Sequence, residues 1–162
     1  MKSLLRTSSF FLLIFAVFTQ AQEFEVKLSL ENGHVGELLF ACQAGASAGY
    51  DRGKDIFCPP GGMGDVGLAW FAPPQADLPG LYKDVRDCVF PQEWKLELQP
   101  PVRKKLILQW NSEQLPKLLT FQLLGTGVDL DMKKAGSLAV STKGTLLIKV
   151  SENRSAPTDE KK

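Results

Sequence analysis

The sequence predicts an all-β protein, an antiparallel β-sandwich of about nine short strands with one long loop rich in glycine and proline. Segments that alternate apolar and polar residues recur along the chain. Turn signals separate these segments roughly every 8 to 12 residues. No stretch shows the 3.6-residue periodicity of an amphipathic helix.

Residues 1–21 have the layout of a cleaved secretory signal. Lys2 and Arg6 precede the apolar run 10–18, and small residues follow at Thr19 and Ala21. The run is about half the roughly 20 residues that a membrane-spanning helix requires. We therefore expect an exported mature chain without a membrane span, located in the periplasm, on the cell surface or outside the cell.

The charge balance gives no reason to expect a nucleic-acid partner. The full chain has 19 Lys and Arg against 18 Asp and Glu, and removing Lys2 and Arg6 leaves 17 basic residues. A nucleic-acid-binding domain needs a basic face. The cluster Arg103–Lys105 is better explained as a solvated strand end than as a polyanion site.

The first strands form a predicted hairpin. Residues 24–30 alternate apolar and polar side chains, and residues 35–42 form the returning strand. Asn32-Gly33 between them is a strong hairpin signal, because both residues tolerate a positive φ.

Further strands are predicted at 66–72, 81–86, 93–99, 102–110, 117–124, 128–132, 137–141 and 144–150. Proline, glycine or polar turns separate them. The last strand is apolar on both faces, which suits a covered position in the sheet. We expect one domain over 22–150, followed by a disordered charged tail over 151–162.

The loop 45–62 is the longest segment without a strand pattern, and long loops in compact domains are often functional. Asp51, Asp55 and the later Asp65 are hard oxygen ligands, which raises the hypothesis of a calcium site, although their spacing is not that of an EF-hand loop. The alternative is that these aspartates bond backbone amides in turns. Apart from this calcium site, no cofactor is expected.

A structural clamp is the preferred role for the segment 84–86. If Val85 lies in the core, Arg86 and Asp84 lie on the outer face or under the long loop. A covered arginine bonds carboxylates bidentately. We therefore predict that Arg86 holds the loop through Asp51 and Asp55.

Three cysteines, Cys42, Cys58 and Cys88, are compatible with one disulfide in an oxidising compartment. All three pairings remain open, and Cys58 is the favoured participant because a bridge there would pin the loop. With a single histidine, the cysteines do not predict a zinc site.

The tryptophans offer a carbohydrate-binding alternative. Trp94 and Trp110 lie on the same strand faces as leucines that are expected to be buried, so both are predicted core residues. Trp70 is the candidate for stacking on a sugar ring.

No enzyme motif is present in the sequence. His34, the single histidine, lies in a hairpin turn, so a catalytic pairing would require distant partners to reach it. There is no G-x-S-x-G, phosphate-binding loop or H-E-x-x-H. We expect a protein that is not an enzyme.

A set of residues along the mature chain carries a family resemblance: Ala46, Gly49-Tyr50-Asp51, Gly53, Asp55, Pro59-Pro60, Asp84-Val85-Arg86, Trp94, Trp110 and Leu115-Pro116. With them the chain resembles a module of exported bacterial proteins that often accompanies carboxy-terminal secretion-sorting domains. The resemblance implies an immunoglobulin-like sandwich and export, without an established activity. The chain departs from it at Cys58 and Cys88, and in having a charged tail where a sorting domain would follow.

Together these observations predict an exported, non-catalytic module with a structural or adhesion role and a protein or glycan partner. The alternative is a carbohydrate-binding module, in a calcium-dependent or a calcium-independent form, that uses the loop 45–65 and Trp70.

Overall fold

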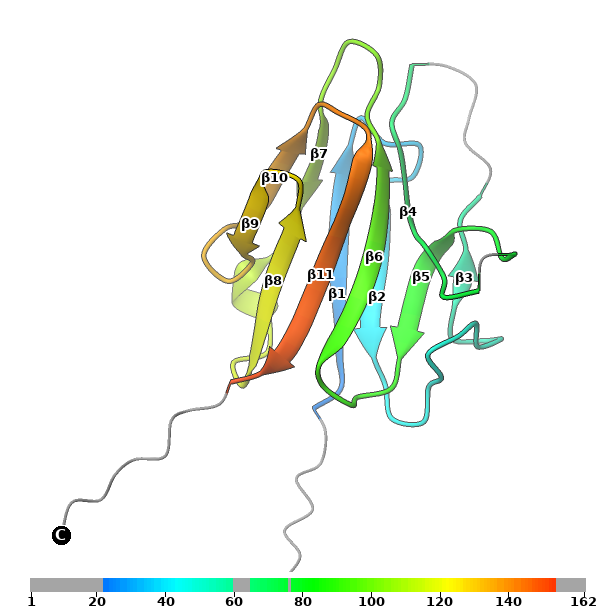
Figure 1. Cartoon of the computed structure of the whole chain (residues 1–162), viewed down its shortest axis with the longest axis vertical. Coiled ribbons are helices and arrows are strands. Elements are labelled where there is room, and N and C mark those ends of the chain that lie inside the picture. Colours follow the sequence, from blue (N-terminus) through cyan, green and yellow to red (C-terminus); the bar gives the residue numbers. More distant parts are fainter. Residues whose placement is uncertain (1–21, 60–64, 76, 154–162) are drawn as a thin grey trace, which may run out of the picture.

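The computed structural model describes residues 22–59, 65–75 and 77–153. They form one sheet of 11 strands in the order β10-β7-β1-β2-β5-β4-β6-β11-β8-β9, with β3 beside β5 (Figure 1). The elements are β1 (Phe24–Glu31), β2 (Glu37–Cys42), β3 (Ile56–Phe57), β4 (Leu68–Phe71), β5 (Leu81–Arg86), β6 (Gln92–Gln99), β7 (Leu106–Gln109), the 3-10 helix η1 (Ser112–Gln114), β8 (Leu119–Gly125), β9 (Val128–Asp131), β10 (Ser137–Val140) and β11 (Gly144–Glu152).

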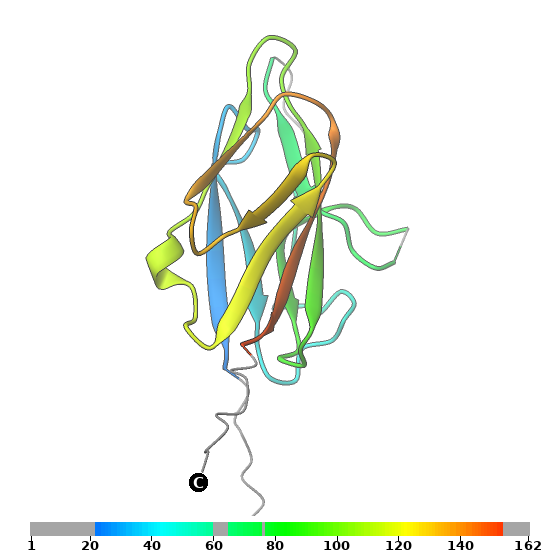
Figure 2. The same cartoon turned by 60° about the vertical axis from the view of Figure 1, so that its left-hand side comes forward.

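The sheet curls so that two halves face each other across the core. β6, β11 and β8 lie in front of β1, β2 and β7 in Figure 1, and Figure 2 shows η1 at the side of the molecule near β1. β4 joins β5 through a single residue pair, Phe71 with Leu81, and this is where the two halves connect.

Aromatic side chains from both halves fill the core. The rings of Phe40 and Trp94 have centroids 5.2 Å apart, and those of Phe40 and Phe71 lie 6.2 Å apart. All three residues are completely buried, as is Phe121 of β8. Edge-to-face and tilted contacts of this kind add to the stabilisation from apolar burial.

The all-β prediction is confirmed, and the architecture differs from a plain antiparallel sandwich in two respects. The sheet is continuous and curled, and β2 pairs with β5 in parallel. A parallel pair needs a long crossover connection. Here the crossover is residues 43–80, which carry the predicted loop together with β3 and β4.

Most predicted strands are present, with shifted ends. The first hairpin turns at Asn32, whose φ of 64° is the positive value that the Asn-Gly signal predicts. β3 was not predicted, because two residues are too few to show a period. β7 starts at Leu106, so the basic cluster Arg103–Lys105 lies in the turn before it.

The last strand lies inside the sheet, between β6 and β8, but only one of its faces is buried, so the prediction of a position covered on both faces is corrected. It continues to Glu152, and Asn153 donates its N–H to the carbonyl of Leu118 at 2.8 Å. The ordered domain therefore extends past the predicted boundary at 150. The predicted signal, residues 1–21, and the tail residues 154–162 lie outside the described residues.

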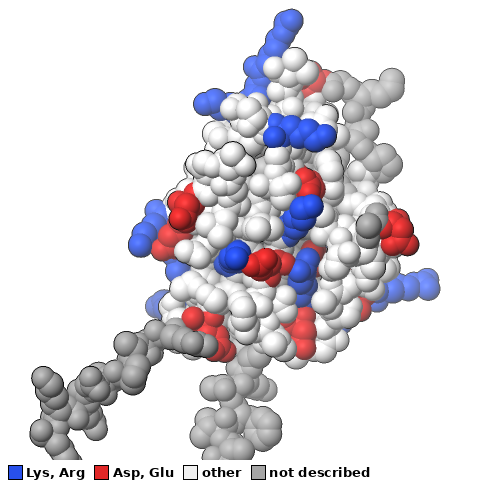
Figure 3. Space-filling view, viewed as in Figure 1, with Lys and Arg blue, Asp and Glu red and all other residues white. Residues whose placement is uncertain are grey.

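Charges of both signs alternate on the outer face of β6 and β11 (Figure 3). Lys95 pairs with Glu97 at 2.8 Å, and Lys149 pairs with Glu93 across the two strands at 2.7 Å. The described part of the chain contains no helix of the length and apolarity needed to cross a membrane.

Candidate functional site

Asp55 anchors the long loop to β5. This side chain is only 4% exposed. Its Oδ1 accepts the backbone N–H of Val85 at 2.7 Å, and its Oδ2 accepts that of Asp51 at 2.6 Å. Asp51 in turn accepts the N–H of Ser47 at 2.5 Å. The two aspartates thus organise the loop by bonding backbone amides, which is the alternative that the sequence left open.

The two carboxylates have opposite pKa shifts. Burial raises the pKa of Asp55, and the nearby carboxylates of Asp84 and Asp51 act in the same direction, against the two accepted N–H groups. The hydrogen bonds from Ser47 lower the pKa of Asp51. Asp55 is therefore the carboxylate whose charge is costly to bury.

Arg86 bonds Asp84, and the predicted clamp from Arg86 to the loop is corrected. Its Nε and Nη2 donate to the two oxygens of Asp84 at 3.1 and 2.9 Å. Its Nη1 donates to the carbonyl of Glu93, and its guanidinium lies 5.5 Å from the ring centroid of Trp94. This buried pair links β5 to β6, while the loop contacts β5 through Asp55.

The reason for this difference is the side of the sheet that Val85 occupies. Val85 is buried, but it packs with Ala41 and Ala46 in a small cluster separate from the main core. Alternation along β5 then turns Asp84 and Arg86 to the opposite face, toward Trp94.

The predicted calcium ligands do not gather at one point. Asp65 Oδ1 accepts the N–H of Val102 at 3.0 Å, away from the bonds that hold Asp51 and Asp55. Among the described residues there is no group of three or more His, Cys, Asp or Glu that could hold a metal ion. The calcium site of Asp51, Asp55 and Asp65 is therefore not supported as a cluster.

The disulfide joins Cys42 to Cys88, and Cys58 is a free thiol. The preference for Cys58 as a disulfide partner was therefore wrong. The parallel register places Cys42 opposite Arg86, two residues before Cys88. This brings the two Cα atoms to 5.1 Å, within the distance that a disulfide spans.

Two of the three tryptophans are core residues, as predicted. Trp94 and Trp110 are 0% and 7% exposed, and their indole N–H groups donate to backbone carbonyls of Asp84 and Met132. Trp70 is half-buried under Gly80, where an added Cβ would lie 2.2 Å from its Cδ1 atom. The chain itself therefore covers part of the ring proposed for sugar stacking.

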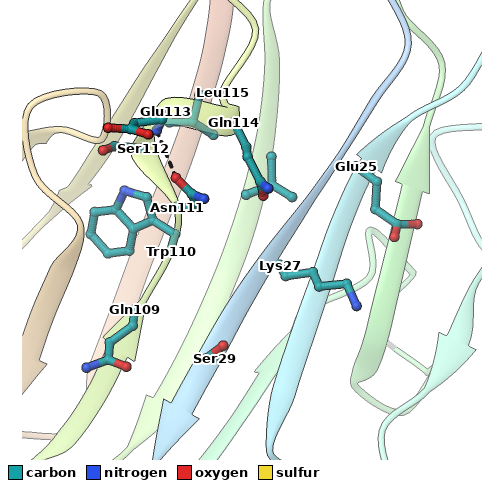
Figure 4. A pocket seen from close by; sticks show the side chains of 11 residues that line it. Glu25, Lys27, Ser29, Gln109, Trp110, Asn111, Ser112, Glu113, Gln114 and Leu115 are labelled. Carbon is teal, nitrogen blue, oxygen red and sulfur yellow. Dashed lines mark hydrogen bonds between the residues drawn. The ribbon is translucent and has the colours of Figure 1, made fainter.

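A groove that was not predicted from the sequence lies beside β1. It has a volume of about 560 Å³ between β1 and the segment that carries η1. Figure 4 shows Trp110, Asn111 and Gln114 on one side of β1, with Glu25 and Lys27 on the other. The amide and hydroxyl side chains in its lining are Gln109, Asn111, Gln114, Ser29 and Ser112.

The backbone of β1 alternates in the direction of its hydrogen bonds. Leu30 donates its N–H to the carbonyl of Gly36, on the side of β2, at 2.8 Å. The N–H and C=O groups of Glu25, Lys27 and Ser29 consequently point to the other side of the strand.

On that other side only the end of β1 is paired. Ser29 pairs with Gln109, where β7 ends, and the chain then turns away into η1. Among the strands that the structure describes, none pairs with residues 24–28 on this side. The backbone groups of Glu25 and Lys27 therefore form an open strand edge along the groove.

His34 and Cys58 are in contact, which was not predicted from the sequence. The Sγ atom of Cys58 lies 3.2 Å from Nε2 of His34. A partner for the histidine has to come from a distant part of the chain, because His34 lies in a hairpin turn. Cys58, which directly follows β3, is that partner.

The chain matches no family model, no curated protein and no solved structure. The resemblance to a bacterial surface module therefore stays a prediction.

Proposed function

We propose that the protein is an exported, non-catalytic binding module that takes up an extended polypeptide strand of a partner protein at the open edge of β1. The observation that carries the proposal is the unpaired backbone of Glu25 and Lys27 beside the groove. An extended peptide can add to such an edge through main-chain hydrogen bonds, and neighbouring pockets then select its side chains.

The groove favours a strand over a helical or lipid ligand. Its lining is mostly polar, so an amphipathic helix would find little apolar surface to cover. The charges on the outer face of β1 are already paired, Glu25 with Lys83 at 2.7 Å and Lys27 with Glu37 at 3.7 Å. Backbone groups and amide side chains remain to supply the hydrogen bonds.

The disulfide Cys42–Cys88 supports export, because disulfides persist mainly in oxidising compartments. An exposed strand edge in any protein needs protection against uncontrolled pairing with other chains. Here η1 and the residues around it line one side of the groove beside this edge. We infer that the groove has room for one extended strand only.

Peptide selection tests the proposal. The purified protein is panned against random peptides of about ten residues, the upper length of common strands, and selected peptides are measured by calorimetry. Lys27→Pro removes an N–H that points into the groove, and edge positions tolerate proline. We expect affinity to fall about tenfold or more, since one backbone hydrogen bond is lost and the ring obstructs the strand.

Lys27→Ala is the matched control, because it removes the same side chain and keeps the N–H; its affinity should be close to that of the wild type. Failure to select any peptide, or equal binding by the Lys27→Pro variant, would overturn the proposal. Tryptophan fluorescence quenching by a polysaccharide, without peptide binding, would instead favour the carbohydrate-binding alternative.

A further inference from the structure

The single histidine of the chain touches its single free thiol. Of the three cysteines, Cys42 and Cys88 form the disulfide, which leaves Cys58. Its Sγ lies 3.2 Å from His34 Nε2 and 3.7 Å from the carbonyl oxygen of Ala69 in β4. A histidine within hydrogen-bond reach of a thiol is the arrangement that activates cysteine nucleophiles.

Backbone hydrogen bonds hold both members of the pair in place. His34 donates its N–H to the carbonyl of Gly67 at 2.8 Å, and Gly67 donates back to Asn32 at 2.7 Å. Cys58 donates its N–H to the carbonyl of Gly80 at 2.8 Å. Backbone hydrogen bonds to three separate segments thus fix the distance between the imidazole ring and the sulfur. This distance does not depend on one flexible turn.

The imidazole can accept the thiol proton. Nδ1 of His34 is buried and has no hydrogen-bond partner among the described residues. In the neutral tautomer that carries its proton on Nδ1, the lone pair of Nε2 is directed at sulfur. Burial raises the pKa of the Cys58 thiol, so its resting form is neutral. Attack by sulfur therefore needs a base, and Nε2 is in position to be that base.

We propose that Cys58 and His34 form a thiol-exchange site that is modified by low-molecular-weight disulfides. His34 Nε2 takes the proton from Cys58 Sγ, and the sulfur attacks one sulfur atom of the small disulfide. A bond forms between Cys58 Sγ and that atom as the original S–S bond breaks. The other half leaves as a thiolate and receives the proton from His34, so the disulfide is the oxidant and no further reagent is needed.

The surroundings favour this ligand class over a metal ion. Cys58 is half-buried, which restricts access to small reagents. The described residues supply no third His, Cys, Asp or Glu ligand beside the pair, whereas a structural metal site needs four. The site is separate from the groove beside β1, and its modification is stoichiometric, so it is independent of the binding role proposed above.

Thiol labelling kinetics test the inference. Folded protein is mixed with 4,4′-dithiodipyridine, and the released thione is followed by absorbance; oxidised glutathione is then used with intact-mass detection. His34→Gln keeps a polar side chain that cannot take up a proton. We expect the rate to fall about tenfold or more in this variant, the low end of general-base effects.

Two controls make each result decisive. Both proteins are also labelled in urea, where the histidine cannot assist and the rates should be equal. Cys58→Ser should give no labelling at all. Equal folded-state rates for the wild type and His34→Gln would overturn the role of the histidine. Absence of labelling in the folded wild type, with complete labelling in urea, would show an inaccessible thiol and overturn the site.

Discussion

Asp55 joins the described part of the long loop to β5. Its carboxylate accepts two backbone N–H groups, one from the loop and one from β5, while nearly excluded from water. Hydrogen bonds to the carboxylate favour its charged form, and burial opposes it. The raised pKa indicates that burial has the larger effect.

A pH titration of stability tests this balance. Because the pKa of Asp55 is raised from 3.8 in the folded state, the folded protein binds this proton more tightly than the unfolded chain. Its contribution to the free energy of unfolding is therefore fully present below 3.8 and is lost as the pH rises through the raised value. The stability advantage of the wild type over Asp55→Asn should shrink with increasing pH in urea unfolding experiments.

Asp51 provides the internal comparison for that titration. Its pKa is lowered, so the stability it contributes is present above 3.8 and is lost as the pH falls through the lowered value. Asp51→Asn should accordingly show the opposite trend against the wild type. If the advantage over Asp55→Asn grew with pH, the two N–H bonds would dominate burial at Asp55.

Among the described strands, β5 pairs with the largest number of other strands, namely β2, β3 and β4. It pairs in parallel with β2, receives β3 on its edge, meets β4 at one residue pair, and contacts β6 through Arg86. The two faces of β5 make different contacts. One face carries the buried Asp84–Arg86 pair toward Trp94, and the other carries Val85 under the loop.

Limited proteolysis can distinguish the attachment of the loop to β5 from the packing of β5 against β6. Asp55→Ala leaves two N–H groups without their acceptor, at a cost of about 2 kcal/mol. We expect trypsin to cut first at Arg52 and Lys54, and at least tenfold faster than in the wild type. Asp129→Ala, an exposed carboxylate on β9, is the matched control and should not change the cleavage rate.

The variant Arg86→Met is compared with Asp55→Ala, to test which of the two residues holds the loop. It leaves Asp84 buried without its cation, which destabilises the whole fold by about 3 kcal/mol. Cleavage should then follow global unfolding, with no preference for the loop. Selective cutting at Arg52 and Lys54 in this variant would restore the clamp predicted from the sequence.

At the scale of the whole molecule, the disulfide ties the two ends of the crossover together. Cys42 ends β2 and Cys88 follows β5, with 46 residues of separation that include the loop, β3 and β4. A closed loop of this length restricts the unfolded chain strongly. The parallel pair and the disulfide therefore stabilise the same part of the fold.

Removal of the disulfide should have a large effect on thermal stability. The paired variant Cys42→Ala/Cys88→Ala is expected to lose about 4 kcal/mol, which lowers the Tm of a domain of this size by more than about 10 °C. Cys58→Ser is the control and should stay within a few degrees of the wild type in calorimetry. Equal melting of all three proteins would mean that the bridge does not constrain the unfolded chain.

Local patterns were sufficient for most of the strands. The alternation in residues 24–30 and 93–99 reports which side chains face the core, because successive residues of a strand point to opposite faces. The turn at Asn32 depends on the φ range of one residue. These properties belong to neighbouring residues, so the sequence alone determined the all-β class and the first hairpin.

The partners of the side chains were decided only by the tertiary structure. The alternation of side chains along a strand predicts that Asp84 and Arg86 share a face of β5. It does not predict which face of β5 packs against the main core. The parallel pairing of β2 with β5 selects Cys42–Cys88, and the crossover brings Cys58 to His34. These contacts join residues 24 or more positions apart, and their geometry follows from the path of the chain through the sheet.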